Sequence, residues 1–165
     1  MTIRLEDPEA RLQLAREEAW RALNRRERTV AELARLLAAK RVEPPAIEAV
    51  VGELCEQGYL DDASYAQRFA EDRRRLDDWG AERIERKLLS LGVDRELIAA
   101  AVGEQDREGE LGAALELLAR RFHAPPQTPR ERDRALGVLL RKGYGLELAH
   151  DAVRRHAGVR DESFD

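Results

Sequence analysis

The residues best suited to chemistry in this sequence are arginines, because 26 of the 29 basic side chains are arginine. A guanidinium binds a carboxylate or a phosphate through two parallel hydrogen bonds. Clustered arginines therefore predict a surface for a negatively charged partner, and solvated helix faces are the alternative. The predicted partner-binding residues are Arg73, Arg74, Arg75, Arg120, Arg121, Arg132, Arg134, Arg141, Lys142, Arg154 and Arg155.

The basic side chains are concentrated towards the end of the chain. Residues 1–110 carry 19 basic and 25 acidic side chains, whereas residues 111–160 carry 10 basic and 5 acidic ones. The whole chain has a net charge of -4. An acidic chain with one local positive region is expected to bind bare DNA weakly, since nonspecific DNA binding depends on neutralising phosphates.

No combination of residues points to catalysis, a cofactor or a metal. His150 and His156 are six residues apart and would lie on different faces of a helix, so they cannot chelate a metal together. Asp61 and Asp62 precede a predicted helix, where capping explains them. Cys55 lies among apolar residues and is expected to be a small core residue.

A single cysteine and a start without an apolar run favour the cytoplasm, and no stretch could span a membrane. The chain is expected to be a non-enzymatic binding protein without metal or cofactor.

The elements that position these residues are predicted to be helices throughout, because the apolar periodicity is helical and no alternating segment predicts a strand. The loop at 103–112 contains acidic residues and glycines. The expected helices cover about 9–23, 30–39, 45–57, 63–76, 80–91, 94–102, 113–122, 130–142 and 146–156.

The sequence also repeats with an offset of 51 residues. Leu37, Leu88 and Leu139 align, and further apolar and turn positions follow the same spacing. At the turn the set is Arg41, Gly92 and Gly143, so an arginine replaces glycine in the first copy. We therefore predict an all-α fold of three tandem three-helix repeats in an elongated, curved array. Three helix hairpins that share only their turns are the alternative.

The predicted division is 9–60, 61–103 and a basic third repeat at 108–157, followed by a flexible tail at 158–165.

Residues 29–37 and 46–58 have the lengths of a helix-turn-helix. The second of these helices carries Glu48, Glu53 and Glu56 and no basic residue. Carboxylates at these positions would repel phosphates. A DNA-binding protein with degenerate helix-turn-helix units, acting through phosphate contacts, is kept as the alternative function.

One segment is more specific than a generic helical pattern. Residues 58–66 read Gly-Tyr-Leu-Asp-Asp-Ala-Ser-Tyr-Ala, and Trp79-Gly80 and Leu91-Gly92-Val93 follow. This combination resembles the RecX family of regulatory proteins. The positions that carry the resemblance are Gly58, Tyr59, Leu60, Asp61, Asp62, Tyr65, Ala66, Gly80 and Gly92.

The resemblance implies a fold of three tandem three-helix repeats and a role in recombination and DNA repair. RecX proteins bind the RecA recombinase filament and restrain its strand exchange and coprotease activity, and some also bind DNA. We therefore expect a regulator of the RecA filament, acting as a monomer, with at most weak binding to single- or double-stranded DNA. The motif residues are expected to form mainly the junction between the first two repeats.

Overall fold

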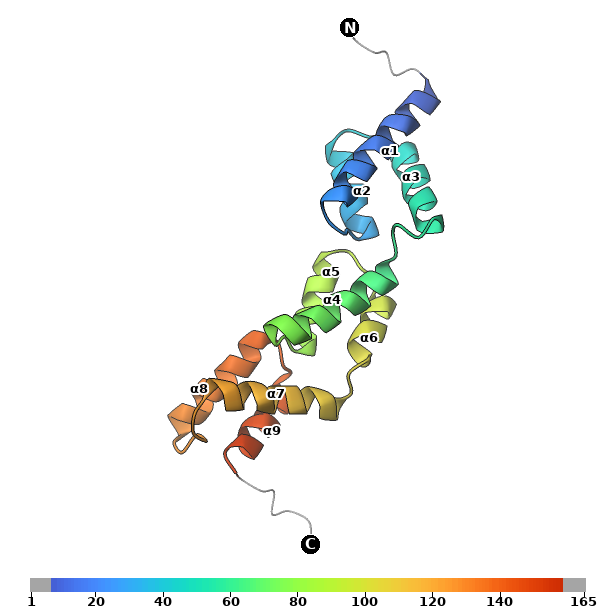
Figure 1. Cartoon of the computed structure of the whole chain (residues 1–165). Helices are drawn as coiled ribbons and strands as arrows, with labels where there is room; N and C mark the ends of the chain where they lie inside the picture. Colours follow the sequence, from blue (N-terminus) through green and yellow to red (C-terminus); the bar gives the residue numbers. More distant parts are fainter. Residues whose placement is uncertain (1–6, 159–165) are drawn as a thin grey trace. The chain divides into compact units, whose positions relative to one another are not determined.

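The computed structural model describes residues 7–158, and this part of the chain is helical without a strand (Figure 1). The all-α prediction is therefore confirmed for these residues. The predicted flexible tail lies, apart from Gly158, outside the described residues. The helices are α1 Pro8–Arg25, α2 Val30–Ala39, α3 Pro44–Glu56, α4 Asp62–Asp77, α5 Ala81–Ser90, α6 Arg95–Gly103, α7 Arg107–Arg121, α8 Pro129–Lys142 and α9 Leu146–His156.

Local sequence sets most helix starts. Thr29 and Thr128 each form a capping box with the glutamate three residues later, which satisfies N–H groups that a helix start leaves without partners. Helix α7 begins six residues before its expected start, because the Asp106 side chain accepts a hydrogen bond from Gly109 N at 2.8 Å. The prediction of a loop over residues 107–112 was therefore wrong: the cap outweighs the low helix propensity of glycine there.

The chain divides into two compact units. One contains residues up to Ala66 together with Leu88–Ile98, and the other contains Gln67–Lys87 together with residues from Ala99 on. Helices α1 to α3 share a core in the first unit, and α7 to α9 share a core in the second. The first core includes Ala15, Ala19 and Ala22 of α1, so this segment is a three-helix unit and not a hairpin alone.

The 51-residue repeat is visible in the backbone. The turn residues Arg41, Gly92 and Gly143 have left-handed φ angles of 63°, 79° and 92°. The aligned residues Leu37, Leu88 and Leu139 are each fully buried. The tandem helical repeat is confirmed in this sense, while the repeat boundaries at 9–60, 61–103 and 108–157 stay a prediction.

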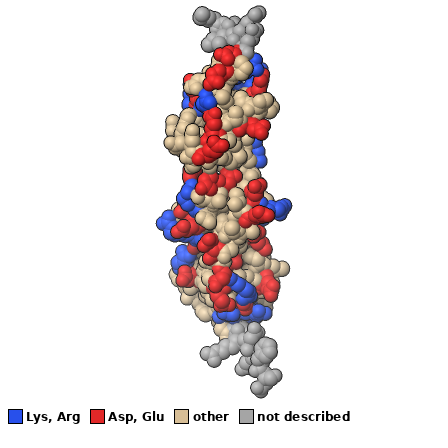
Figure 2. All heavy atoms as spheres, turned by 90° about the vertical axis from the view of Figure 1, so that its right-hand side faces the viewer, with Lys and Arg blue, Asp and Glu red and all other residues tan. Residues whose placement is uncertain are grey.

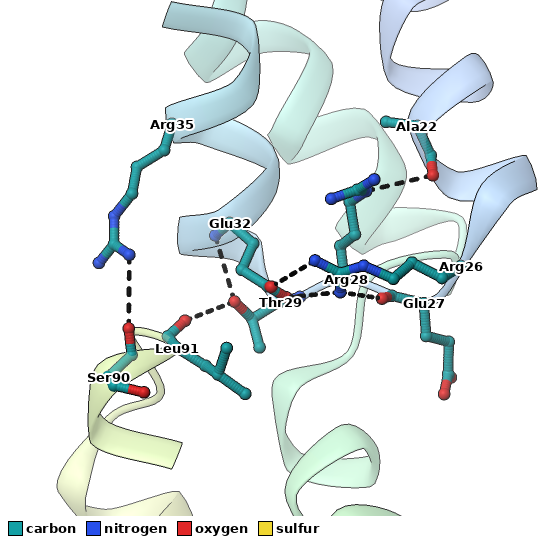
Figure 3. A network of polar contacts seen from close by, with 9 residues as sticks. All are labelled: Ala22, Arg26, Glu27, Arg28, Thr29, Glu32, Arg35, Ser90 and Leu91. Carbon is teal, nitrogen blue, oxygen red and sulfur yellow. Dashed lines mark hydrogen bonds and ion pairs between the residues drawn. The ribbon is translucent and has the colours of Figure 1, made fainter. Parts of the chain in front are cut away.

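Joint A, inside the first unit, connects the start of α2 to the turn between α5 and α6 (Figure 3). The Thr29 hydroxyl donates to Leu91 O at 2.6 Å, and Val30 N donates to Asp62 Oδ1 at 3.0 Å. A Cβ atom on Gly92 would lie 2.3 Å from the Cβ of Ala31. The joint therefore depends on the missing side chain of a glycine.

Joint B, inside the second unit, connects the start of α5 to the turn between α8 and α9. Gly80 N donates to Lys142 O at 2.8 Å, and Ala81 N donates to Glu110 Oε1 at 2.9 Å. The two joints thus connect equivalent positions of the repeat, although the donor to the turn is a hydroxyl in joint A and a backbone N–H in joint B. The matching pairs, each 51 residues apart, are Thr29 and Gly80, Val30 and Ala81, and Leu91 and Lys142.

Two predictions about buried positions were wrong. Cys55 is exposed, because it falls on the outer side of α3 beside the buried Leu54. On α8 the expected core stripe was Leu136, Leu139 and Leu140, but Leu140 is 37% exposed. The buried residues there are Ala135, Val138 and Leu139.

Candidate partner-binding surface

The second unit contains a hollow of about 420 Å³ bordered by α5, α7 and α8. Four of the predicted cations, Arg120, Arg121, Arg141 and Lys142, meet at this hollow. A fifth cation comes from α5, and a single carboxylate accompanies them. The lining residues are Asp78, Arg83, Leu117, Arg120, Arg121, Val138, Arg141 and Lys142.

Part of this charge is used inside the fold. The Arg120 guanidinium pairs with Asp78 at 2.6 Å. Lys142 Nζ donates to the carbonyl of Asp77 at 2.9 Å. Within the described part of the chain, the guanidinium groups of Arg121 and Arg141 meet no carboxylate, and both residues are exposed. The hollow therefore keeps a net positive charge that the protein's own acids do not neutralise.

A second hollow of about 330 Å³ shares Arg121 with the first and adds Arg134. Arg134 and Arg141 are seven residues apart on α8, about two helical turns, so they point to the same side. Arg132 is nine residues from Arg141, about two and a half turns, and points to the opposite side. We call the connected set the basic strip: Arg83, Arg120, Arg121, Arg134, Arg141 and Lys142.

Two arginines of the triplet on α4 act within the fold. Arg73 forms an ion pair with Asp77 one turn later. Arg74 is half-buried and donates to Val102 O at 2.7 Å, and its desolvation lowers its pKa. Arg75 is exposed. The triplet therefore does not present three free cations on one face.

The cations of α9 surround an acid. Asp151 is 9% exposed and lies 3.2 Å from Arg107, 3.3 Å from Arg154 and 3.6 Å from Arg155. Burial by itself would raise the pKa of Asp151, but the hydrogen bonds from Arg154 and Arg107 outweigh it and hold the pKa below its ordinary value. Arg154 and Arg155 thus help to stabilise the third segment.

Arg83 is the residue of the strip that sequence reasoning missed. Its guanidinium carbon lies 4.2 Å from the centroid of the Trp79 ring, and its Nη1 donates to Arg141 O at 3.1 Å. Trp79 precedes α5, so helical spacing does not account for this contact. The available signal was an arginine close in sequence to a tryptophan, because arginine stacks on tryptophan.

All the family-motif residues except Gly80 lie in the first unit, which contains joint A. Leu60 and Ala66 are buried, whereas Gly58 ends α3 with a φ of 80°. Asp61 accepts from Ser64 N at 3.1 Å and caps α4. The remaining motif residues include Tyr59, whose ring lies edge-on to Trp20 with centroids 4.6 Å apart, and Tyr65, which is half-buried. With Asp62 and Gly92 in joint A and Gly80 in joint B, these residues act within the fold.

The acidic helix α3 keeps its charge pattern in the structure. Arg16 of α1 donates two hydrogen bonds to the Glu53 carboxylate, at 2.9 and 2.8 Å, which lower the pKa of Glu53. Glu48 and Glu56 are exposed. A helix with this surface is unsuited to reading DNA in the major groove.

The charges elsewhere are mixed. On the face shown in Figure 2, basic and acidic side chains alternate, and neither sign forms a large continuous area.

Among residues 7–158 no group of three or more potential ligand side chains is placed to hold a metal ion. Over the same residues, none of the helices combines the length and the apolar character that crossing a bilayer requires.

These observations define a class, a helical-repeat protein with a local cationic surface, and comparisons with known proteins identify the family. The model of the first three-helix domain of RecX matches residues 15–54, and that of the second matches residues 61–102. The regulatory protein RecX of Leptothrix cholodnii is 35% identical over 136 residues, which cover 82% of this chain and 85% of the relative. The RecX of Amycolatopsis mediterranei is 33% identical over 151 residues, covering 89% and 85%. The chain therefore belongs to the RecX family. Both of these relatives are regulatory proteins by name.

Solved structures show the same fold. The crystal structure of RecX from Lactobacillus salivarius matches 92% of this chain and 99% of that chain with a TM-score of 0.80, at 17% sequence identity. A second structure, of a regulatory protein RecX, matches 91% of this chain and 72% of that chain with a TM-score of 0.73, at 19% identity. The family resemblance expected from the motif is confirmed.

Proposed function

We propose that this chain is a non-enzymatic, cytoplasmic regulator that binds the RecA recombinase filament and inhibits or modulates its strand exchange and coprotease activity. Membership of the RecX family supports the regulatory role. The observation that points to a contact surface is the basic strip, in which Arg121 and Arg141 meet no carboxylate of their own chain within the described residues.

The mechanism follows from binding alone. A recombinase filament is a repeated protein assembly around a nucleic acid, so it presents carboxylates and phosphates at regular intervals. Arginines whose guanidinium groups meet no carboxylate of their own chain can bind such groups in pairs of hydrogen bonds. A binder that touches two neighbouring protomers restrains movement between them. An amount of regulator below one copy per recombinase protomer should therefore be enough to reduce strand exchange and DNA-dependent ATP hydrolysis.

The discriminating experiment is a salt titration with two arms. One arm measures binding to bare single-stranded DNA, and the other measures binding to a recombinase filament preformed on the same DNA. Each phosphate contact adds a slope of roughly -0.7 to a log–log plot of affinity against salt. We expect tighter binding and a shallower slope with the filament. Equal affinity and slope in both arms would favour the DNA-binding alternative.

Charge reversal on α8 tests the strip itself. The double variant Arg134→Glu/Arg141→Glu should weaken filament binding at least tenfold. The matched control Arg95→Glu/Arg132→Glu changes the net charge equally, but at exposed positions outside the strip. It should weaken binding far less. Equal losses in the two double variants would show that net charge, and not this surface, sets the affinity.

A further inference from the structure

The turn Lys40-Arg41-Val42 is the first copy of a turn that occurs three times in the repeat. The second and third copies have Gly92 and Gly143 at the central position, 51 and 102 residues after Arg41. All three central residues have a left-handed backbone, with φ angles of 63°, 79° and 92°. Glycine adopts this conformation freely, whereas a residue with a side chain is strained in it. Arginine at position 41 is therefore an unfavourable choice for the turn itself.

The fold makes no use of the Arg41 side chain. Arg41 is exposed, and among residues 7–158 its guanidinium forms no ion pair or hydrogen bond. The two cations closest to it in the same hollow are both paired: Lys40 lies 2.9 Å from Glu18, and Arg11 lies 3.1 Å from Glu43. A strained residue without a contact inside its own fold points to a role outside the fold.

Arg41 borders a hollow of about 530 Å³ in the first unit, between α1 and the turn that leads into α3. Part of the lining is apolar, and Leu14 of α1 is 43% exposed there. The charged part contains two ion pairs and the unpaired Arg41, so the hollow has a surplus of one positive charge. The lining residues are Arg11, Leu14, Glu18, Lys40, Arg41, Val42, Glu43 and Ala46.

We propose that this hollow binds an acidic segment of a partner protein, in which an apolar side chain stands next to a carboxylate. The apolar side chain covers Leu14 and removes its surface from water. The carboxylate accepts two parallel hydrogen bonds from the Arg41 guanidinium. A nucleic acid strand is a poorer match, because the carboxylates of Glu18 and Glu43 line the same hollow and repel phosphates. The identity of the partner as a recombinase protomer rests on the proposed function, and the chemistry of the hollow does not.

The variant Arg41→Gly tests the proposal with the recombinase filament. It removes the guanidinium and gives the turn the residue that its two copies have. We expect at least fivefold weaker binding to the preformed filament, with a melting temperature equal to or above that of wild type. Leu14→Ala should also weaken binding. The matched control Arg95→Ala removes an exposed cation outside the hollow and should bind like wild type.

Filament binding that is unchanged in Arg41→Gly, or weakened equally in the Arg95 control, overturns the proposal. A lower melting temperature of Arg41→Gly would also overturn it, because Arg41 would then serve the fold by stabilising the end of α2.

A peptide titration tests the hollow without the filament. The probes are acetyl-Ala-Leu-Glu-Ala-amide and the matched peptide with glutamine in place of glutamate. At millimolar concentration the glutamate peptide should shift the amide NMR signals of Val42 and Ala46. The glutamine peptide, and the glutamate peptide with Arg41→Gly, should bind at least fivefold more weakly. The absence of these shifts, or equal binding of the two peptides, overturns the proposal.

The two arms separate this proposal from the proposed function. A wild-type protein that ignores the filament but binds the glutamate peptide in the hollow contradicts the recombinase as partner and supports the acidic segment. An oligothymidylate that shifts the signals of Val42 and Ala46 more strongly than the peptide would assign the hollow to phosphates instead, and this result overturns the proposal.

Discussion

Joint A is held by a threonine hydroxyl, whereas joint B is held at the same position of the repeat by a backbone N–H. Thr29 N is occupied by the Glu32 side chain at 3.0 Å, so its hydroxyl makes the bond to Leu91 O. Gly80 has no side chain, and its own N–H makes the bond to Lys142 O. The same geometry is therefore reached by two chemistries, and at this position of the repeat joint A depends on a removable side-chain donor whereas joint B does not.

The two joints also differ in how closely the glycine of the turn approaches the neighbouring helix. A Cβ on Gly92 would meet the Ala31 side chain, whose Cα is 3.8 Å away. A Cβ on Gly143 would meet the backbone of Arg83, with its N at 2.6 Å. Side-chain contacts can be relieved by a second substitution, whereas backbone contacts cannot. Joint B is thus the more tightly constrained of the two.

The largest effect is expected for Gly143→Ala. The added Cβ overlaps the backbone of α5 and the residue must keep a φ of 92°, so the free energy of unfolding should fall by about 3 kcal/mol. Gly92→Ala should cost about 2 kcal/mol, and Ala31→Gly in the same chain should restore part of it. Urea unfolding followed by circular dichroism measures these values.

Gly58→Ala is the control for this comparison. Gly58 has a φ of 80°, but nothing lies within 4 Å of an added Cβ. It should cost only about 1 kcal/mol, the penalty for the left-handed backbone. Equal losses at Gly58 and Gly143 would contradict the close approach in joint B.

Thr29→Ala should have the next largest effect. The Thr29 side chain is fully buried, caps α2 and satisfies Leu91 O, so its removal should cost about 2 kcal/mol. Thr29→Ser keeps the hydroxyl and should cost clearly less. If both variants lose the same stability, the methyl group and not the hydroxyl holds joint A.

Glu110→Ala removes the acceptor of the Ala81 N–H in joint B and should cost about 1 kcal/mol. Glu110→Gln retains an acceptor oxygen at the same position and should be close to wild type. Thermal unfolding of the two variants at neutral pH is sufficient. A glutamine variant as unstable as the alanine variant would mean that charge, and not hydrogen bonding, is important there.

The smallest effect is expected for Asp62→Asn in joint A. Burial raises the pKa of Asp62 above its ordinary value and outweighs the bond from Val30 N. The folded state therefore disfavours the ionised form of Asp62. The contribution of Asp62 to the free energy of unfolding is fully favourable below the pKa that Asp62 has in the unfolded chain. It is lost as the pH rises through the folded pKa. Asparagine keeps the acceptor without charge, so the variant should equal or slightly exceed wild type in stability at pH 7.

That difference should vanish as the pH falls towards the ordinary pKa of an aspartate, about 3.9. Asp62→Ala, which loses the acceptor at every pH, should be less stable than wild type throughout. Stability of the three proteins measured against pH separates these cases. An asparagine variant that is destabilised at pH 7 would show that the Asp62 charge strengthens joint A.

The sequence by itself determined the helices and their repetition, because both depend on local properties. Apolar residues at helical spacing define which face is buried, and glycine at positions 92 and 143 indicates a left-handed turn. Local patterns were insufficient where two signals competed. The Asp106 cap extended α7 into a stretch containing glycines, and Cys55 was placed in the core although only its neighbour Leu54 is buried.

Only the tertiary structure decided which cations share a surface. Arg120 meets Asp78, 42 residues away, and Arg83 joins α8 residues 58 positions later. Helical periodicity gives the direction of a side chain from its own axis, but not the partner that the next helix brings to it. The sequence therefore predicted a basic third segment, and folding divided its arginines between ion pairs within the protein and a strip that remains positively charged.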